Sequence, residues 1–273
     1  MIRHIARLIP PRRDKYVRLF LGAAPVGYLT KPAAEALHGV AAPAADGGGM
    51  VLAGPGALER AAALLSEAGF YKRRSEDFDV RSRPDGPVLG RIDRGALPVF
   101  GLLAEGVHMN GIVWRADGLH LWVGKRAADR PMDPGKLDHL VAGGIPAGLT
   151  PEATLVKEAE EEASLPREMV LRARPVGEIS YTLARPEGLR RDRLHCYDLE
   201  LPEDFRPAPR DREIVGFTLM PAAEVMRILR ETDDFKFNVA VVVIDCLLRH
   251  GVIGGAEGQA MRRALSVLLW DFG

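Results

Sequence analysis

The sequence predicts an α/β protein in which a mixed β-sheet is flanked by helices, with a small α/β unit ahead of it. Strand-like and helical runs are interspersed without regular alternation, which favours a mixed sheet over a purely parallel one. The chain has 273 residues, of which 47% are apolar, and can therefore form an ordinary domain and a smaller one. We expect a small N-terminal α/β domain over residues 1–105 and the larger domain, with C-terminal helices, over residues 106–273.

The first 105 residues predict few elements and contain no recognisable catalytic spacing. A strand is expected around residues 17–21 and a helix around residues 31–38. A loop rich in Ala, Gly and Pro follows at residues 41–49, and a second helix is expected over residues 56–69. This unit alone therefore indicates no activity.

The N-terminus carries basic residues ahead of an apolar run, which is typical of a signal peptide. Gly22, Pro25 and Gly27 interrupt that run, however, and no convincing cleavage site follows it. We therefore expect a strand and a turn of the folded protein. The apolar run at residues 239–248 is too short to cross a bilayer, so no transmembrane segment is expected.

The charge balance argues against binding to nucleic acid or to an anionic membrane, and the cysteines argue against a disulfide or a cysteine metal site. Lys+Arg and Asp+Glu both number 37, so the net charge of zero creates no field that would attract nucleic acid or an anionic membrane. Cys196 and Cys246 lie in apolar runs without a CxxC spacing. They are expected to be buried reduced thiols of a cytoplasmic protein rather than a disulfide or a metal site.

From residue 106 onward the pattern becomes clearer. Two strand-like runs, VHMNGIVWR and LHLWVGKR, are joined by Ala-Asp-Gly at residues 116–118, which predicts a hairpin. Trp114 and Trp122 alternate with apolar residues in these runs and are predicted to lie in the core. A short strand is expected at residues 137–142, and further strands, a helix at residues 221–231 and two more helices complete the chain.

A helix is predicted between two proline signals. Thr150-Pro151 supplies a hydroxyl at the N-cap and a proline at the first helical position. Leu165-Pro166 ends the helix, because the residue before a proline disfavours helical backbone.

This helix contains the acidic run KEAEEEASL at residues 157–165. Glu158, Glu161 and Glu162 are related as i, i+3 and i+4 and therefore share a face, whereas Glu160 falls outside it and is expected to be solvated. Lys157 is expected to point elsewhere, so the three carboxylates would repel one another unless a cation neutralised them. A solvated helix face would tolerate this repulsion, but a divalent cation such as Mg²⁺ or Mn²⁺ would remove it.

The preceding loop favours the cation. From Gly143, five residues lead to Leu149 and seven more to Val156, immediately before the acidic run. This arrangement resembles the Nudix box, in which Gly, five residues, Glu and seven residues precede Arg-Glu-hydrophobic-any-Glu-Glu-any-Gly-hydrophobic. Lys157 stands in place of the arginine, Leu149 in place of the first glutamate, and Ser164 in place of the late glycine.

The resemblance extends from about residue 108 to residue 251. It is to a branch of the Nudix superfamily with an N-terminal domain of uncharacterised type, fused in some fungal members to thiamine pyrophosphokinase. The resemblance implies a Nudix-type α/β/α sandwich and Mg²⁺-dependent hydrolysis of an organic diphosphate. The expected substrate is thiamine diphosphate or a damaged analogue, and the N-terminal unit is expected to line part of the pocket or a homodimer contact.

The family pattern also implies roles for individual residues. Glu158, Glu161 and Glu162 would hold the metal, and the carbonyl of Gly143 would join them. The general base is either Glu161 or Glu213, the latter in the run DREIVGF, where a loop carboxylate without a role is an equal alternative. Arg126 could bind a substrate phosphate, because its fixed donors suit oxyanions, or it could be a solvated strand end.

The residues are compatible with further functions. His108, His139 and His195 occur singly and predict core or surface histidines, not a metal cluster. An isopentenyl diphosphate isomerase shares the fold but needs a cysteine and histidine ligands near the site. Hydrolysis of a nucleoside diphosphate derivative is compatible with the sequence, and so is metabolite sensing without catalysis, which Leu149 favours.

Overall fold

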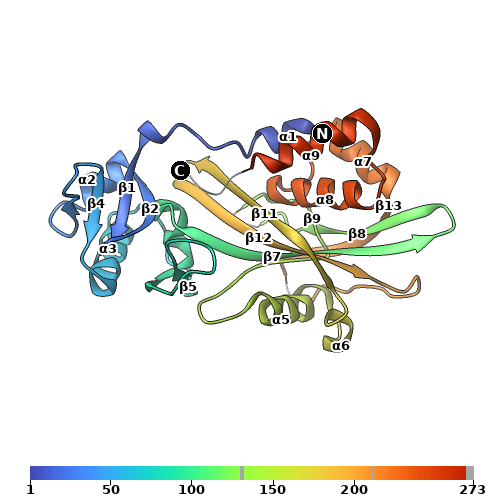
Figure 1. Cartoon of the computed structure of the whole chain (residues 1–273). Coiled ribbons are helices and arrows are strands. Elements are labelled where there is room, and N and C mark those ends of the chain that lie inside the picture. Colours follow the sequence, from blue (N-terminus) through green and yellow to red (C-terminus); the bar gives the residue numbers. More distant parts are fainter. Residues whose placement is uncertain (130–131, 211, 269–273) are drawn as a thin grey trace.

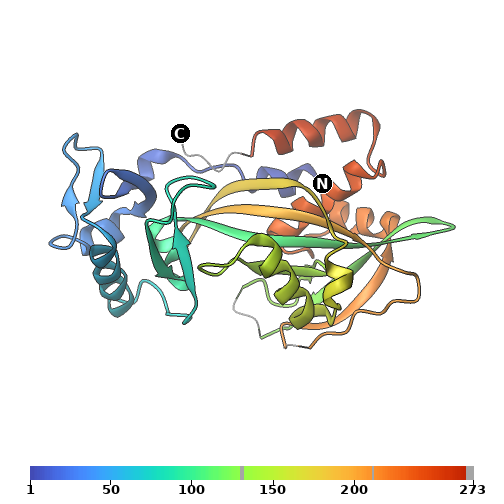
Figure 2. The same ribbon diagram turned by 60° about the horizontal axis from the view of Figure 1, so that its bottom comes forward.

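The computed structural model describes residues 1–129, 132–210 and 212–268 (Figure 1). A long mixed sheet has helices on both faces, and a smaller body lies at one end of it (Figures 1 and 2). The prediction of a mixed α/β fold is confirmed, because β12 runs parallel to β7 while the other neighbours in the long sheet are antiparallel. No helix among the described residues has the length and apolar character needed to cross a membrane.

The long sheet has the strand order β11-β12-β7-β8-β13. Two short strands pair outside this path, β10 with β7 and β9 with β8. The single strand expected at residues 137–142 is therefore two strands with different partners. The bounds are β7 Leu103–Arg115, β8 Gly118–Arg126, β9 Leu137–Asp138, β10 Val141–Gly144, β11 Arg174–Arg185, β12 Gly188–Glu200 and β13 Ile214–Pro221.

Helices cover the two faces of this sheet. On one face lie α5, Pro151–Ala163, and the short α6, Arg167–Val170. The opposite face carries α7, Ala222–Glu231, α8, Phe237–Arg249, and α9, Gly255–Ser266 (Figure 1). Each face buries its own apolar core, which is the expected sandwich.

The predicted hairpin between β7 and β8 is present. Arg115 pairs with Gly118, so the turn consists of two residues, and Gly118 has a φ of +114° that favours glycine. Trp122 is buried as expected, but the prediction that Trp114 lies in the core is wrong, because 46% of this residue is exposed. Trp114 is next to the last residue of β7, and its ring lies against His250 at the end of α8 with ring centroids 5.8 Å apart, so the end of this helix covers it only in part.

The smaller body is built on a four-stranded sheet of order β2-β1-β4-β3 and a separate β5–β6 hairpin. Its apolar side chains form a core of their own. Its elements are β1 Tyr16–Leu21, β2 Ala24–Thr30, α2 Lys31–Ala36, β3 Ala42–Pro43, β4 Gly49–Leu52, α3 Pro55–Glu67, β5 Asp77–Val80, β6 Gly90–Asp93 and α4 Leu97–Phe100, with 3-10 turns at Arg13–Lys15 and Arg94–Ala96.

The first residues of the chain pack away from this smaller body. Helix α1, Ile2–Ala6, lies beside α8 and α9, and its Ile5 is buried in their core (Figure 1). Arg3 also donates a hydrogen bond to the carbonyl of Arg230 at 2.7 Å. The division at residue 105 remains a prediction, and the N-terminal unit hereafter denotes residues 16–102.

Candidate active site

Helix α5 begins and ends where the sequence predicts. The Thr150 hydroxyl accepts a hydrogen bond from the Ala153 N–H at 3.1 Å, and Pro151 occupies the first helical position. At the other end Ser164 has a left-handed φ of +54°, and its hydroxyl donates to the Ala208 carbonyl at 2.7 Å. The backbone thus adopts at Ser164 the conformation that the expected glycine would adopt most easily.

Two of the three predicted glutamates lie directly against strand β10. The Glu162 carboxylate is 7% exposed and accepts a hydrogen bond from the Ala142 N–H at 2.8 Å. A Cβ built on Gly143 would lie 2.4 Å from the Glu158 side chain. The glycine is therefore required by the close approach of Glu158, and the structure brings Gly143, Glu158 and Glu162 together as predicted.

Glu161 lies at the open edge of this group, and Lys157 joins it to Glu158. The side chain of Glu161 is 52% exposed. Lys157 Nζ donates to Glu158 Oε1 at 3.0 Å and to Glu161 Oε2 at 2.8 Å. The expectation that Lys157 points elsewhere is wrong, because a lysine four residues before Glu161 reaches it across one helical turn.

Glu160 lies apart from this group, as expected, and the solvent-exposed Arg210 pairs with it at 3.0 Å.

The carboxylates remain incompletely neutralised. Burial raises the pKa of Glu158 and outweighs the opposing hydrogen bond from Lys157. Lys157 supplies a single positive charge to the two carboxylates of Glu158 and Glu161. Carboxylate oxygens beside a glycine carbonyl are the donor set that Mg²⁺ or Mn²⁺ prefers, so these residues fit the predicted metal.

A cavity of about 390 Å³ adjoins the group at Gly143. Its lining comes from both parts of the chain, with Phe70, Tyr71 and Phe78 from the N-terminal unit and Gly143 and Gly144 from β10. The volume lies within the range of small-molecule pockets. The cavity can therefore hold an organic group next to the carboxylates.

Glu213 and Arg126 both line this cavity, as the prediction of a site would require. Glu213 is half-buried in the segment leading into β13. Arg126 is buried, and its guanidinium donates to Asp138 Oδ2 at 2.6 Å and to the carbonyls of Met132 and Asp133 at 3.1 and 3.2 Å. The alternative of a solvated strand end is wrong, and the role of Arg126 as a phosphate ligand stays a prediction because protein acceptors already occupy its donors.

The buried histidines form no metal cluster within the described residues. His108 and His139 are both buried, and their ring planes are perpendicular with centroids 5.0 Å apart. Burial lowers the pKa of His139 to about 4 and lowers the pKa of His108 as well. Both are core histidines that stay neutral, although the sequence did not indicate that they touch.

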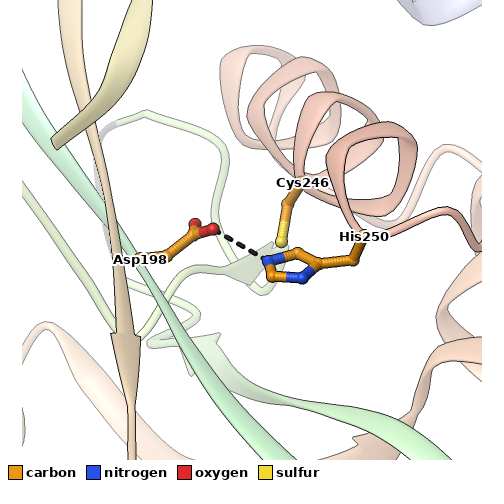
Figure 3. Close-up of side chains that lie close together, drawn as sticks. All are labelled: Asp198, Cys246 and His250. Carbon is orange, nitrogen blue, oxygen red and sulfur yellow. Dashed lines mark hydrogen bonds and ion pairs between the residues drawn. The ribbon is translucent and has the colours of Figure 1, made fainter. Parts of the chain in front are cut away.

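A second polar group lies under α8 on the opposite face (Figure 3). Asp198, Cys246 and His250 are the one set of three His, Cys, Asp or Glu residues with metal-ligand spacing in the described ranges. Asp198 already accepts hydrogen bonds from Arg249 at 3.1 Å and from Asn110 at 2.9 Å, and it lies 2.9 Å from His250 Nε2. Arg249 and His250, at the end of α8, thus bind the Asp198 carboxylate and join α8 to β12. Burial raises the pKa of the Cys246 thiol.

The N-terminal unit lines part of the cavity, which is one of the two roles expected for it, but the sequence did not indicate which of its residues would do so. A Cβ on Gly144 would lie 2.7 Å from the Phe78 ring and 3.8 Å from the Arg94 guanidinium carbon. The β5 backbone also holds the loop before α5, since the Ala147 N–H donates to the Asp77 carbonyl at 2.7 Å. No local spacing could have predicted these contacts.

The sheet, the glycine loop and the carboxylate helix define a class of protein. The family model described as the NUDIX domain matches residues 106–240, and this part of the chain belongs to the Nudix family. The expectation of a Nudix domain is thereby confirmed.

Three relatives extend the likeness. The chain is 46% identical over 180 residues to Nudix hydrolase 20, chloroplastic, of Arabidopsis thaliana, a match covering 66% of this chain and 48% of that protein. It is 44% identical over 180 residues to Nudix hydrolase 24, chloroplastic, of the same plant, with 66% and 49% covered. It is 32% identical over 204 residues to the uncharacterized protein YJR142W of Saccharomyces cerevisiae, with 69% and 58% covered. The chain thus spans about half the length of the plant relatives.

Proposed function

We propose that this chain hydrolyses an organic diphosphate with the help of a divalent cation, Mg²⁺ or Mn²⁺. The observation that carries the proposal is the incompletely neutralised group of Glu158, Glu161 and Glu162 beside Gly143, at the edge of a cavity suited to a small molecule. Hydrolysis of a diphosphate places negative charge on phosphoryl oxygens, so it depends on positioning and positive charge more than on covalent chemistry.

The residues of the group would bind the cation, restrain the carboxylates or accept a proton. Glu158, Glu161, Glu162 and the Gly143 carbonyl would hold the cation, which when bound supplies positive charge for the phosphoryl oxygens and lowers the pKa of water. Lys157 restrains Glu158 and Glu161 by the hydrogen bonds it donates to them. The proton of the attacking water would pass to Glu161 or to Glu213.

The substrate we propose is thiamine diphosphate or a damaged analogue, cleaved to the monophosphate and phosphate. The resemblance to the thiamine-associated branch supports this choice, and so does a cavity whose walls include the aromatic rings of Phe70, Tyr71 and Phe78. A nucleoside diphosphate derivative would suit the same walls. The cytoplasmic location and a homodimer stay predictions.

A metabolite sensor without catalytic activity is the second candidate. Leu149 favours it, since this side chain is 41% exposed where the family box has its first glutamate.

A substrate panel separates these candidates. Wild type, Glu161→Gln and Glu160→Gln are assayed for released phosphate and for nucleoside monophosphates on thiamine, sugar and nucleoside diphosphates and derivatives, with Mg²⁺ or with EDTA. We expect turnover of one class by the wild type and Glu160→Gln, and loss in Glu161→Gln or with EDTA. A wild type inactive across the panel, or a Glu161→Gln protein as active as the wild type, would contradict the hydrolase.

A further inference from the structure

We propose that the N-terminal unit supplies a phosphate-binding arginine, Arg94, to the Nudix site. The diphosphate end of the substrate would lie between Arg94 and the cation-binding carboxylates. This inference rests on the proposed function for the identity of the ligand, but it concerns binding and is tested without turnover.

Arg94 lies beside the carboxylate group. Its guanidinium carbon would lie 3.8 Å from a Cβ on Gly144, the residue that follows the candidate metal ligand Gly143. Arg94 lines the same cavity as Gly143. Arg94 therefore belongs to the part of the cavity wall that adjoins the carboxylate group.

The cations that the long sheet and α8 contribute to the cavity wall are engaged by the protein. Arg126 pairs with Asp138, and Arg190 pairs with Asp192. Lys236, at the start of α8, also pairs with Asp138. Positive charge on that side is largely compensated.

The N-terminal unit presents its cations differently. Lys72 and Arg74 line the cavity, are exposed, and form no ion pair with any residue in the described ranges. Arg94 donates from Nη1 to the Glu76 carboxylate at 2.8 Å, and its own side chain is 48% exposed. The guanidinium fork thus retains donors for an oxyanion.

Arg94 is held in place before a ligand arrives. Its guanidinium carbon lies 5.7 Å from the centroid of the Phe78 ring, a distance typical of a cation–π contact. Its backbone N–H donates to the Glu76 carbonyl at 2.7 Å. The preceding Asp93 is buried and accepts hydrogen bonds from the backbone N–H groups of Arg74 and Gly95 at 2.9 and 2.8 Å. A prearranged arginine loses less freedom on binding a phosphate.

The positions of the two charged groups select the ligand chemistry. An arginine opposite a cation-binding carboxylate group suits a ligand that bears several phosphoryl oxygens, some facing the cation and others facing the guanidinium. A diphosphate has this form.

The test measures binding of a diphosphate mimic that is not hydrolysed. Methylenediphosphonate is titrated in the presence of Mg²⁺ into the wild type, Arg94→Ala, Arg94→Lys and the matched control Arg73→Ala, by calorimetry. Arg73 is exposed in the same segment and does not line the cavity. Mn²⁺ binding in the absence of diphosphonate is followed by electron paramagnetic resonance, and circular dichroism confirms that each variant is folded.

We expect Arg94→Ala to bind the diphosphonate about 10-fold to 100-fold more weakly, because a charge-assisted bidentate contact is lost. Arg94→Lys should restore part of the affinity, Arg73→Ala should match the wild type, and Mn²⁺ alone should bind every variant equally. Equal diphosphonate binding by Arg94→Ala and the wild type, or no binding by the wild type, would overturn the inference. A wild type that binds the mimic with this Arg94 dependence but turns over no substrate would refute the proposed hydrolysis and leave the arginine site standing.

Discussion

The two faces of the long sheet each hold a carboxylate in a polar group, and the protein compensates the charge of the two carboxylates to different extents. Asp198, under α8, is 2% exposed and is surrounded by donors from Arg249, Asn110 and His250. Burial opposes its ionisation, yet these hydrogen bonds outweigh burial and lower its pKa. Glu158, on α5, accepts a hydrogen bond from one lysine, and burial raises its pKa.

The difference separates a structural carboxylate from a functional one. A buried charge whose hydrogen bonds are all supplied by the protein has little capacity for a ligand and mainly joins two elements. A carboxylate group that the fold leaves incompletely neutralised, at the edge of a cavity, retains capacity for a cation. Substitutions on the two faces should therefore affect different measurements.

The largest effect should follow substitution on the α5 face. Glu158→Gln is expected to lower kcat/KM on the substrate identified by the panel about 100-fold or more, the size of effect seen when one preorganised electrostatic group is removed. The free energy of unfolding should change by less than about 1 kcal/mol, because the raised pKa shows that ionised Glu158 costs stability at neutral pH. Steady-state kinetics measures the loss of activity, and urea denaturation measures the free energy of unfolding. Full activity in the variant would show that the Glu158 carboxylate is not needed for catalysis.

Substitution on the α8 face should give the converse. Asp198→Asn leaves Arg249 and His250 without their shared carboxylate and should lower the free energy of unfolding by about 3 kcal/mol. The matched control is Asp245→Asn, which removes an Arg249 partner that is 26% exposed and should cost about 1 kcal/mol or less. Urea denaturation measures both, and kcat of the folded fraction should stay at the wild-type value. A large activity loss without destabilisation would show that Asp198 has a functional role.

A pH titration sharpens the comparison for a buried imidazole. His139 is faced by Asp138, Lys236 and His108, and burial dominates to lower its pKa to about 4 from an ordinary value of 6.5. The unfolded chain therefore binds a proton between these values that the folded chain does not, so stability falls as pH is lowered from 6.5 toward 4. His139→Gln should flatten that dependence by up to about 1.4 kcal/mol per pH unit, measured by urea denaturation at pH 7, 6 and 5. An unchanged slope would show that the pKa of His139 is the same in the folded and unfolded chains, which would contradict the effect of burial.

The smallest effect should come from Glu160, which lies on α5 but outside the carboxylate group. Glu160→Gln removes an exposed ion pair with Arg210, and such pairs contribute at most about 1 kcal/mol. Activity and Mn²⁺ affinity should equal those of the wild type. A loss comparable to that of Glu158→Gln would mean that charge along the whole helix, rather than geometry at Gly143, carries the function.

How much the sequence could predict depends on how local the signal is. Thr150 and Pro166 are local signals, and α5 begins and ends beside them. The direction of the Lys157 side chain and the exposure of Trp114 depend on the ends of long side chains and on where the covering helices stop, and both predictions were wrong. The box spacing indicated the carboxylate group.

The contacts of the N-terminal unit with the site could not be predicted from any motif. Phe78 and Arg94 approach Gly144 only because two regions with separate apolar cores pack together. A motif reports residues near one another along the chain, whereas this approach depends on the packing of many side chains. Arg126 was predicted to bind substrate and does line the cavity, whereas Lys72, Arg74 and Arg94 of the N-terminal unit were missed for the same reason.

The hydrogen bond from Ala147 to Asp77 joins the loop before α5 to a strand of the N-terminal unit. Any inherited or engineered change in the β5–β6 hairpin can therefore alter the shape of the site while every residue of the box stays the same. Two proteins with identical boxes and different hairpins need not share a substrate. Grouping such proteins by the hairpin sequence as well as by the box would therefore separate proteins that act on different substrates better than the box alone.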